Sequence, residues 1–592
     1  MARGGLGRRI AGWLGVALAA FAMRAASADG VSPGPRGFAD AVLAGRHPRL
    51  TIVISIDQFR ADYLRRFVQL FLPARQANGR PGGFRYLMSE GVDYVDAHQD
   101  DVPTFTCVGH ALILSGSYPY KSGIIGNHWF DPAEHAVVAC TEDPDVKVVG
   151  AAPGSTAKPM GPRRLRVTTV GDELKLATNG AARVVSLSLK ERAAIMLGGH
   201  TADVTLWFDE TGARWISSTA YATDGRLPDW VERINQEEIP ARSLGTVWTP
   251  MVPAAVLERA IPGRTSDAPP DPFGSTFPHH LDSERSIDNF RRFGLMPAAN
   301  AFVFETAERA ITAERLGQRP DTPDLLALNL ATNDYVGHTF GPYSAEVADL
   351  TVRTDRMLAD FLDFVDRTVP GGLRAVVVVL TADHGVAPVP EDLQARGIPA
   401  GRIPLADIAG HVNDALGRAF GGGPWIGNGP DGKPAGAFVD PNLYLAAAAI
   451  DQALQTGKAA SRAEIEAAAA RALEQEPGVY AAYTRTQLST GAVPATDIGR
   501  LVTRGFHPKV SGDVLVVAEP GFWADEPVAT THGTPYQYDT LVPLLLAGPG
   551  IARGVRTERV SVADVAPTLS LLLGIAPPSG SDGAVLGGAL GQ

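Results

Sequence analysis

Aspartate and histidine side chains of the kind that bind metal ions recur at four points along the chain. They are Asp57, Asp334, His338, Asp383, His384 and His532. Carboxylate oxygens and imidazole nitrogens together suit zinc. Six such side chains could hold two ions about 4 Å apart, the spacing at which paired metals clamp the attacking and leaving oxygens of an in-line displacement.

Taken singly, each of these residues also has an ordinary structural explanation. An aspartate after a strand often caps a helix, and a histidine in a loop is often solvated or hydrogen-bonded. The spacing of Asp334 and His338 lets one helical turn or loop aim both side chains at one ion. The prediction of a site for two metal ions therefore rests on the placement of all six residues together.

Four apolar runs predict the sheet that positions these residues, and the first three of them lead into the polar motifs, whereas the fourth leads into Gly-Pro-Gly. Residues 50–56 (LTIVISI), 325–330 (LLALNL), 375–380 (AVVVVL) and 541–547 (LVPLLLA) are typical of strands buried on both faces, and residues 60–72 favour a helix. Strands alternating with helices predict an α/β fold, a doubly wound, mostly parallel sheet with helices on both faces. Ligands bind such sheets beyond the carboxyl ends of the strands.

The 592 residues fit one large domain with inserted segments. After residues 1–28 we expect a single catalytic domain over 29–592, with insertions around 136–300 and 386–530. Residues 204–218 predict a hairpin, and residues 459–476 a helix. These insertions would form a cap over the catalytic edge of the sheet.

Residues 1–28 have the composition of a secretory signal peptide. Arg8 and Arg9 belong to a basic start, an apolar stretch follows, and Ala26-Ser27-Ala28 forms a small-residue cleavage site. We expect a periplasmic or secreted protein with no membrane span after removal of the signal. An uncleaved anchor is the alternative, and the sequence leaves general secretion and twin-arginine export both open.

The chain holds two cysteines, Cys107 and Cys140. A lone pair in an oxidising compartment favours a disulfide, and two buried free thiols are the alternative. The formal net charge of −11 argues against general affinity for nucleic acid or anionic membrane. It leaves anionic substrates open, because metals and basic side chains can dominate a local pocket.

Three phrases give the chain a family resemblance. They are residues 56–64 (IDQFRADYL), residues 103–106 (PTFT) with Gly109-His110, and residues 532–536 (HGTPY). Together with the ordered ligand set, they resemble the alkaline phosphatase superfamily, in particular bacterial phosphatases with a threonine nucleophile. The similarity runs from about Leu50 to Pro577.

The resemblance implies that Thr106 is the nucleophile of a phosphate-ester hydrolase with two Zn²⁺ per chain. Asp57, Asp383 and His384 would hold the zinc that activates Thr106, itself a metal ligand. The other zinc ligands would be Asp334, His338 and His532. Thr106 would form a phospho-threonine intermediate at the start of a helix, where backbone N–H groups favour phosphate oxygens. The same threonine could also serve as an ordinary helix N-cap.

The resemblance also implies the substrate class. Asn127 is similar to an asparagine that contacts a phosphoryl oxygen, and Lys190 with Arg192 resembles the Lys-x-Arg pair of monoesterases. Two cations favour a doubly charged phosphate monoester over a diester. A solvated Lys-Glu-Arg run is the structural alternative for that pair. Type I phosphodiesterase or nucleotide pyrophosphatase activity on the same metal core is the second candidate.

Other classes fit the sequence less well. The cysteine-dependent sulfatase pattern is absent after Cys107, which Val-Gly-His-Ala follows. A binding protein that had lost catalysis should lack a ligand or the nucleophile, and an anchored lipid phosphotransferase should have transmembrane helices. We expect small phosphorylated substrates and no nucleic-acid-binding domain. The oligomeric state stays open, with a monomer as one option.

Overall fold

The computed structural model describes residues 47–253, 255–256, 274, 276–428, 432 and 434–590. The expected signal peptide, residues 1–28, lies outside the described residues. Within the described ranges, no helix combines the length and the apolar character that crossing a membrane would need.

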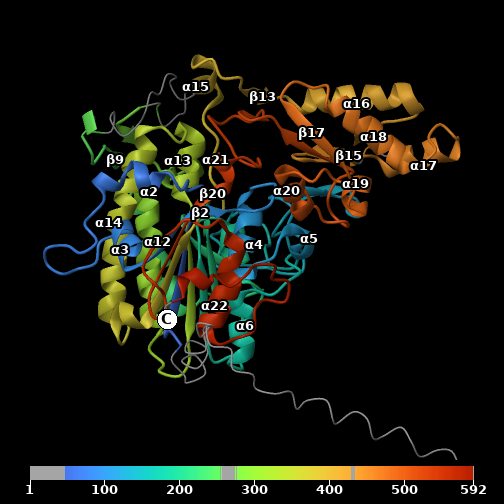
Figure 1. Ribbon diagram of the computed structural model, residues 1–592. Helices are drawn as coiled ribbons and strands as arrows, with labels where there is room; N and C mark the ends of the chain where they lie inside the picture. Colours follow the sequence, from blue (N-terminus) through green and yellow to red (C-terminus); the bar gives the residue numbers. More distant parts are fainter. Residues whose placement is uncertain are drawn as a thin grey trace, which may run out of the picture.

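A central sheet of 11 strands organises the molecule (Figure 1). Ten strands follow one another in the order β21 (Gly554–Arg556), β2 (Gly91–His98), β20 (Leu541–Ala547), β12 (Val376–Thr381), β1 (Leu50–Ile56), β11 (Asp324–Leu330), β6 (Val184–Leu187), β7 (Val204–Asp209), β8 (Arg214–Ser218) and β5 (Val148–Val149). β22 (Val560–Ser561) pairs with β2 off this path.

The middle of the sheet is parallel. β1 pairs in parallel with β11 on one side and β12 on the other, and β6 and β7 continue the parallel run beyond β11. Every residue of β1, β11 and β12 is buried. Continuous apolar runs are what strands covered on both faces require, so the predicted mostly parallel α/β sheet is confirmed.

β20 differs from the prediction that it repeats the strand–helix pattern of its neighbours. It runs antiparallel to β12 and to β2, so β2 points the same way as β12. An apolar run fixes burial but not direction, because both orientations bury the same side chains. As a result, the residues before β20 lie at the edge where β1, β11 and β12 end.

Helices cover both faces of the sheet (Figure 1). One layer contains α3 (Phe84–Glu90), α12 (Pro297–Ala313) and α14 (Ala345–Thr368). The other contains α4 (Thr106–Ser115), α6 (Val170–Ala177), α7 (Glu191–Gly198) and α22 (Val565–Leu573). Burial on both sides explains why the sheet has so few polar positions away from its functional edge.

The helix predicted over residues 60–72 is much shorter than expected. α2 covers Tyr63–Arg66 and a 3-10 turn covers Val68–Leu70. Tertiary bonds replace the helical ones here, because the Leu72 N–H donates to the Asp355 carboxylate of α14 at 2.7 Å. The hairpin β7–β8 and helix α18 (Arg462–Leu473) agree with their predicted ranges.

A second sheet has its own hydrophobic core (upper right in Figure 1). Its order is β14 (Gly427–Asn428), β15 (Pro434–Val439), β16 (Asn442–Tyr444), β18 (Val514–Ala518) and β17 (Val479–Thr484). Helices α16 (Leu405–Phe420), α17 (Ala447–Gln455) and α18 pack around it. From this region α20 (Asp497–Gly505) returns to contact α5 (Pro119–Ser122) of the main body.

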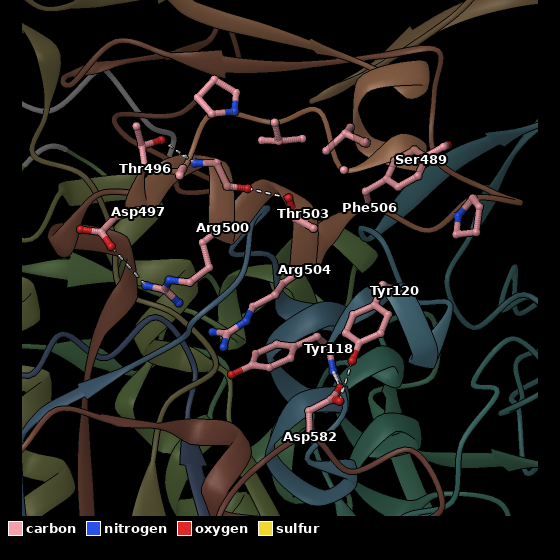
Figure 2. Close-up of a pocket in the computed structure, with 17 residues that line it drawn as sticks. Tyr118, Tyr120, Ser489, Thr496, Asp497, Arg500, Thr503, Arg504, Phe506 and Asp582 are labelled. Atoms are coloured by element: carbon pink, nitrogen blue, oxygen red, sulfur yellow. Dashed lines mark hydrogen bonds and ion pairs between the residues drawn. The ribbon is translucent and has the colours of Figure 1, made fainter.

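A cavity of about 1250 Å³ lies at this junction (Figure 2). Arg500 and Arg504 of α20 face Tyr118 and Asp582 of the main body across it. Arg504 stacks over the Tyr118 ring, with 4.4 Å between guanidinium carbon and ring centroid. The second sheet is therefore held to the main body by side chains as well as by its connections.

Cys107 and Cys140 form a disulfide, which confirms the first of the two expected alternatives. Cys107 is the second residue of α4, and Cys140 follows β4 (Ala136–Ala139). β4 forms a hairpin with β3 (His128–Asp131). The bridge therefore ties the start of α4 to this hairpin.

Candidate active site

The sheet topology brings the predicted side chains to one edge. Asp57 follows β1, Asp334 lies in α13 (Thr332–Phe340) directly after β11, and Asp383 follows β12. Lys190 lies three residues after β6, and His532 precedes the antiparallel β20. All five residues are buried, although they come from segments up to 475 residues apart (532 − 57).

Thr106 lies beside two carboxylates and an imidazole. Its Oγ1 is 3.3 Å from Nε2 of His384, which in turn lies 3.1 Å from Oδ2 of Asp383 and 3.8 Å from Oδ1 of Asp57. Thr106 is the first residue of α4, and Phe105 holds the N-cap position. The alternative of an N-cap threonine is therefore wrong, and the hydroxyl is left for other contacts.

A second group is richer in histidine. Nε2 of His338 lies 3.1 Å from Oδ1 of Asp334, and Nε2 of His532 lies 3.7 Å from the same oxygen. The His532 ring stacks on His384, with 3.5 Å between ring centroids. We call the six residues Asp57, Asp334, His338, Asp383, His384 and His532 the ligand cluster.

Backbone carbonyls fix the orientation of all three histidines of the ligand cluster. Nδ1 of His338 lies 2.8 Å from the Thr530 carbonyl oxygen, and Nδ1 of His384 and of His532 makes the same kind of bond, to Gly385 and Thr104. A ring that donates its Nδ1 proton presents Nε2 as a lone pair. Each of these Nε2 atoms faces a carboxylate, as metal-binding imidazoles do.

Two buried oxygens of the cluster have no hydrogen-bond partner within the part of the chain that the structure describes. They are Oδ1 of Asp57 and Oδ2 of Asp383. A buried charged oxygen is costly unless something compensates it. Together with the oriented Nε2 atoms, these oxygens supply the donor set that zinc takes. The residues present therefore fit a dinuclear metal site.

His110 is a buried residue beside the site to which sequence reasoning gave no role. One of its ring nitrogens lies within 4.8 Å of a carboxylate oxygen of Asp57 and of Asp383, so these three residues could hold one ion. However, Nδ1 donates to the Thr106 carbonyl at 2.8 Å, and Nε2 lies 2.8 Å from Nδ2 of Asn329. With both nitrogens engaged, His110 positions Thr106 and Asp383. The four-residue spacing from Thr106 on one helix was the available signal.

The two groups of ligands that lie close together in the structure differ from the two groups that the family resemblance implies. His384 shares a compact ligand group with Asp334 and His532, whereas Asp57 and Asp383 form the other with His110. His384 also contacts Asp57 and Asp383, as above, so it lies between the two halves. Because His384 lies between the two halves, it belongs to one group by distance in the structure and to the other by family resemblance.

Gln58 and Thr104 support the cluster from neighbouring loops. Gln58 donates its backbone N–H to Asp383 at 3.1 Å and its side-chain Nε2 to Asp334 at 2.8 Å. The Thr104 hydroxyl donates to the Thr534 carbonyl at 3.1 Å and accepts from the Gly533 N–H at 3.2 Å. Thr104 thus joins the Thr106 loop to the His532 loop.

Lys190 lies inside the cluster and reaches both halves. Its Nζ is 3.0 Å from Oδ2 of Asp57 and 2.5 Å from Oδ2 of Asp334. Burial opposes its charge, but these two carboxylates raise the pKa of Lys190. Lys190 therefore stays charged at any ordinary pH. A fully buried ammonium in this position is unlike the solvated run that the structural alternative supposed.

Arg192 and Asn127 lie at the border of the cluster. The Arg192 side chain is 26% exposed and pairs with Glu191 at 3.5 Å. The Asn127 Oδ1 accepts from the Cys107 backbone N–H at 2.9 Å, which leaves Nδ2 as the end that can donate to a substrate oxygen. Of the predicted residues, these two contact the ligand cluster least directly.

Charges within the cluster shift the pKa values of its members in opposite directions. Burial, and then the nearby Asp383, raise the pKa of Asp57 to about 6. Burial works against protonation of His384, yet Asp383 raises its pKa to about 9. Burial and the neighbouring His384 hold the pKa of His532 well below its usual value. Such strongly coupled, oppositely perturbed groups are typical of functional sites.

Comparison with known proteins agrees with this geometry. Residues 51–537 match the family model described as type I phosphodiesterase / nucleotide pyrophosphatase. The chain therefore belongs to this family.

Within the family, the chain is similar to proteins named alkaline phosphatases. It is 35% identical to the alkaline phosphatase PhoV of Synechococcus elongatus, with 91% of this chain and 92% of that protein covered. It is 32% identical to the alkaline phosphatase PafA of Elizabethkingia meningoseptica, with 92% and 95% covered. The crystal structure of wild-type PafA superposes with a TM-score of 0.80, covering 92% of this chain and 99% of that one. The alkaline-phosphatase-like fold is thereby confirmed.

Proposed function

We propose that the protein, a phosphate-monoester hydrolase of the alkaline phosphatase type, attacks its substrate with Thr106 at a centre that holds two zinc ions. The observation that carries this proposal is the position of the Thr106 hydroxyl, 3.3 Å from His384 and next to buried carboxylates. Asp57, Asp383 and His384 would hold one ion with Thr106, and Asp334, His338 and His532 the other.

Zinc bound at these residues would lower the pKa of a coordinated hydroxyl and offset the charge that develops on the attacking and leaving oxygens. The fit rests on the free Nε2 atoms and on the two carboxylate oxygens without hydrogen bonds. Mixed nitrogen and oxygen donors of this kind suit zinc better than magnesium or calcium, which prefer oxygen ligands alone.

The reaction we propose has two displacements at phosphorus. Oγ1 of Thr106 gives up its proton to solvent and forms a bond to phosphorus as the bond to the alcohol oxygen breaks; the alkoxide takes up a proton from solvent and leaves as the alcohol, and phospho-threonine remains. Water then loses a proton to solvent and attacks phosphorus, and the bond to Oγ1 breaks, which releases phosphate and, after Oγ1 takes up a proton, restores the threonine hydroxyl. Thr106 lies at the positive end of the α4 dipole, which favours phosphoryl oxygens, and the Cys107 N–H of this turn already donates to Asn127.

Three further residues would bind the phosphoryl group. Asn127 can donate through Nδ2, while Lys190 and Arg192 bring positive charge. A monoester carries a second negative charge that a diester lacks, so two cations favour the monoester. The family match to phosphodiesterases keeps diester hydrolysis as the second candidate.

We also propose that the protein is exported, because residues 1–28 have the pattern of a signal peptide. The Cys107–Cys140 disulfide supports this proposal, since disulfides persist in oxidising compartments.

The test is a comparison of kcat/KM for an aryl phosphate monoester and the matching diester with zinc-loaded enzyme. Thr106→Ala should lower both by at least about a thousandfold, because it removes the nucleophile. The double change Lys190→Ala/Arg192→Ala should lower the monoester value about a hundredfold and the diester value far less.

Arg226→Ala is the matched control, because Arg226 has an 84% exposed side chain. It should leave both values unchanged. Equal or faster diester turnover by the wild type would assign the protein to the phosphodiesterase reaction. Full activity of Thr106→Ala would remove Thr106 from the mechanism.

A further inference from the structure

A second cavity, of about 650 Å³, opens beside His338. Tyr335, His338 and Thr339 of α13 form one wall. His338 therefore belongs to the ligand cluster and to this cavity at once, and its side chain is 20% exposed. The larger cavity of Figure 2 is lined by none of the six ligand-cluster residues.

The other walls of the cavity beside His338 are mainly apolar. They come from four separate parts of the chain, and the residues are Leu189, Phe208, Phe290, Leu295 and Val528. Leu189 directly precedes Lys190, and the Tyr335 ring lies 5.1 Å from Lys190 Nζ. The apolar surface therefore begins where the charged cluster ends.

The charges at the rim of this cavity are already paired. Arg291 pairs with Glu210 at 2.7 Å and with Asp288 at 3.5 Å. Arg292 pairs with Asp282 at 3.4 Å. Glu526 adds a further carboxylate to the lining. An anionic group that entered would meet satisfied arginines and repelling carboxylates, so an uncharged group is favoured.

We infer that this cavity receives the leaving alcohol, and that the protein prefers monoesters of uncharged, apolar alcohols. The inference rests on the proposed function, in which Asp334, His338 and His532 lie on the side of the leaving oxygen. Carbon atoms attached to that oxygen would extend past His338 into the apolar space. Burying them adds binding energy that small alcohols cannot provide.

The test uses alkyl phosphates whose alcohols have similar basicity, so that differences report contacts and not leaving-group chemistry. They are ethyl phosphate, 2-cyclohexylethyl phosphate and 4-phosphooxybutyrate, which ends in a carboxylate. We expect kcat/KM of the zinc-loaded enzyme to be about tenfold higher for the cyclohexylethyl ester than for the other two.

Val528→Trp should occupy part of the apolar lining and lower the ratio of kcat/KM for the cyclohexylethyl ester to that for the ethyl ester. Val555→Trp, at a residue 56% exposed on β21, is the matched control and should keep the wild-type ratio. Leu295→Asn is a second variant, which makes the wall polar and should reduce the ratio if Val528→Trp fails to fold. Calorimetric Kd values for ethyl- and 2-cyclohexylethyl-phosphonate should follow the same order without turnover.

The outcomes separate the two proposals. If none of the three esters is hydrolysed, the proposed function itself is contradicted. Hydrolysis of all three at equal kcat/KM, with no change in Val528→Trp, would overturn the leaving-group cavity and leave the phosphatase intact. A preference for the carboxylate-ended ester would overturn the inference that the alcohol is uncharged.

Discussion

Buried carboxylates lie at two places along the same edge of the central sheet, and their charges are compensated in different ways. Asp100 follows β2 and accepts from Arg500 at 2.7 Å, from Arg559 at 2.8 Å and also from Arg504. We call these four residues the arginine cluster. In the ligand cluster, three carboxylates face three imidazoles, and among the described residues Lys190 is the one permanent cation that pairs with them.

The pKa values of Asp100 and Asp57 are shifted in opposite directions. Burial alone would raise the pKa of Asp100, but the hydrogen bonds from Arg500 and Arg559 outweigh it and lower the value. Asp57, without an arginine, has its pKa raised to about 6 by burial and Asp383. A carboxylate paired with fixed arginines is suited to a structural role. Carboxylates that face one another with few fixed cations nearby favour the binding of a metal ion. The pKa shifts thus distinguish Asp100, a structural carboxylate, from Asp57, a candidate metal ligand.

The largest expected effect is the response of the ligand cluster to Asp57→Asn. Loss of one metal-binding carboxylate should lower kcat/KM on an aryl monoester at least about a thousandfold. Zinc content, measured on purified protein, should fall from two to one per chain. The metal-free variant should melt at a higher temperature than the metal-free wild type, because one of three facing carboxylates is gone. A lower melting temperature would show that Asp57 is structural after all.

Asp100→Ala should have the opposite profile. It leaves three arginines without their common partner and should lower the free energy of unfolding by about 2 kcal/mol, discounted because those side chains are about a third exposed. Zinc content and kcat/KM should change little. Asp497→Ala is the control, since Asp497 touches Arg500 from a 96% exposed position and should have no effect. Loss of zinc in Asp100→Ala would end the distinction between the clusters.

A smaller, pH-dependent effect is expected at Asp101, which lies next to the arginine cluster. Both its carboxylate oxygens are buried without a hydrogen bond, and burial, then Asp100, raise its pKa to about 8. The unfolded chain releases this proton near pH 4, so the folded state binds more protons between about pH 4 and pH 8. Stability from this group is therefore lost as pH rises through that range.

Asp101→Asn removes this titration. Its free energy of unfolding relative to wild type should increase by at least about 1 kcal/mol from pH 5 to pH 8. Thermal melts at matched zinc concentration across that range would measure the difference. A constant difference would mean that Asp101 is ionised in the folded protein, held by Arg504.

The sequence was most informative where burial and chemistry coincide. Strands β1, β11 and β12 are continuous apolar runs that end in polar motifs, so their existence and their common edge could be predicted. The direction of β20 could not, because an apolar strand looks the same in both directions. The short helix after β1 was also missed, since its missing turns are replaced by a bond from Leu72 to Asp355, distant in sequence.

The same limits apply to the site. The predicted ligands converge because each lies in a segment that adjoins the same edge of the sheet, and Lys190 lies among them. Their metal, and the roles of Thr106, Asn127 and Arg192, stay predictions. The parts played by His110, Gln58 and Thr104 were not predicted, because they depend on hydrogen bonds between loops that only the assembled fold brings together.

The Cys107–Cys140 disulfide links the position of Thr106, the proposed nucleophile, to the oxidation of two thiols. Cys107 adjoins Thr106 and donates its N–H to Oδ1 of Asn127, while Cys140 donates to the Asn127 carbonyl. One covalent link thus joins the proposed nucleophile and the amide proposed to contact the phosphoryl group. A chain that matured with reduced thiols would keep all six residues of the ligand cluster, but Thr106 would lose this covalent tie to the β3–β4 hairpin.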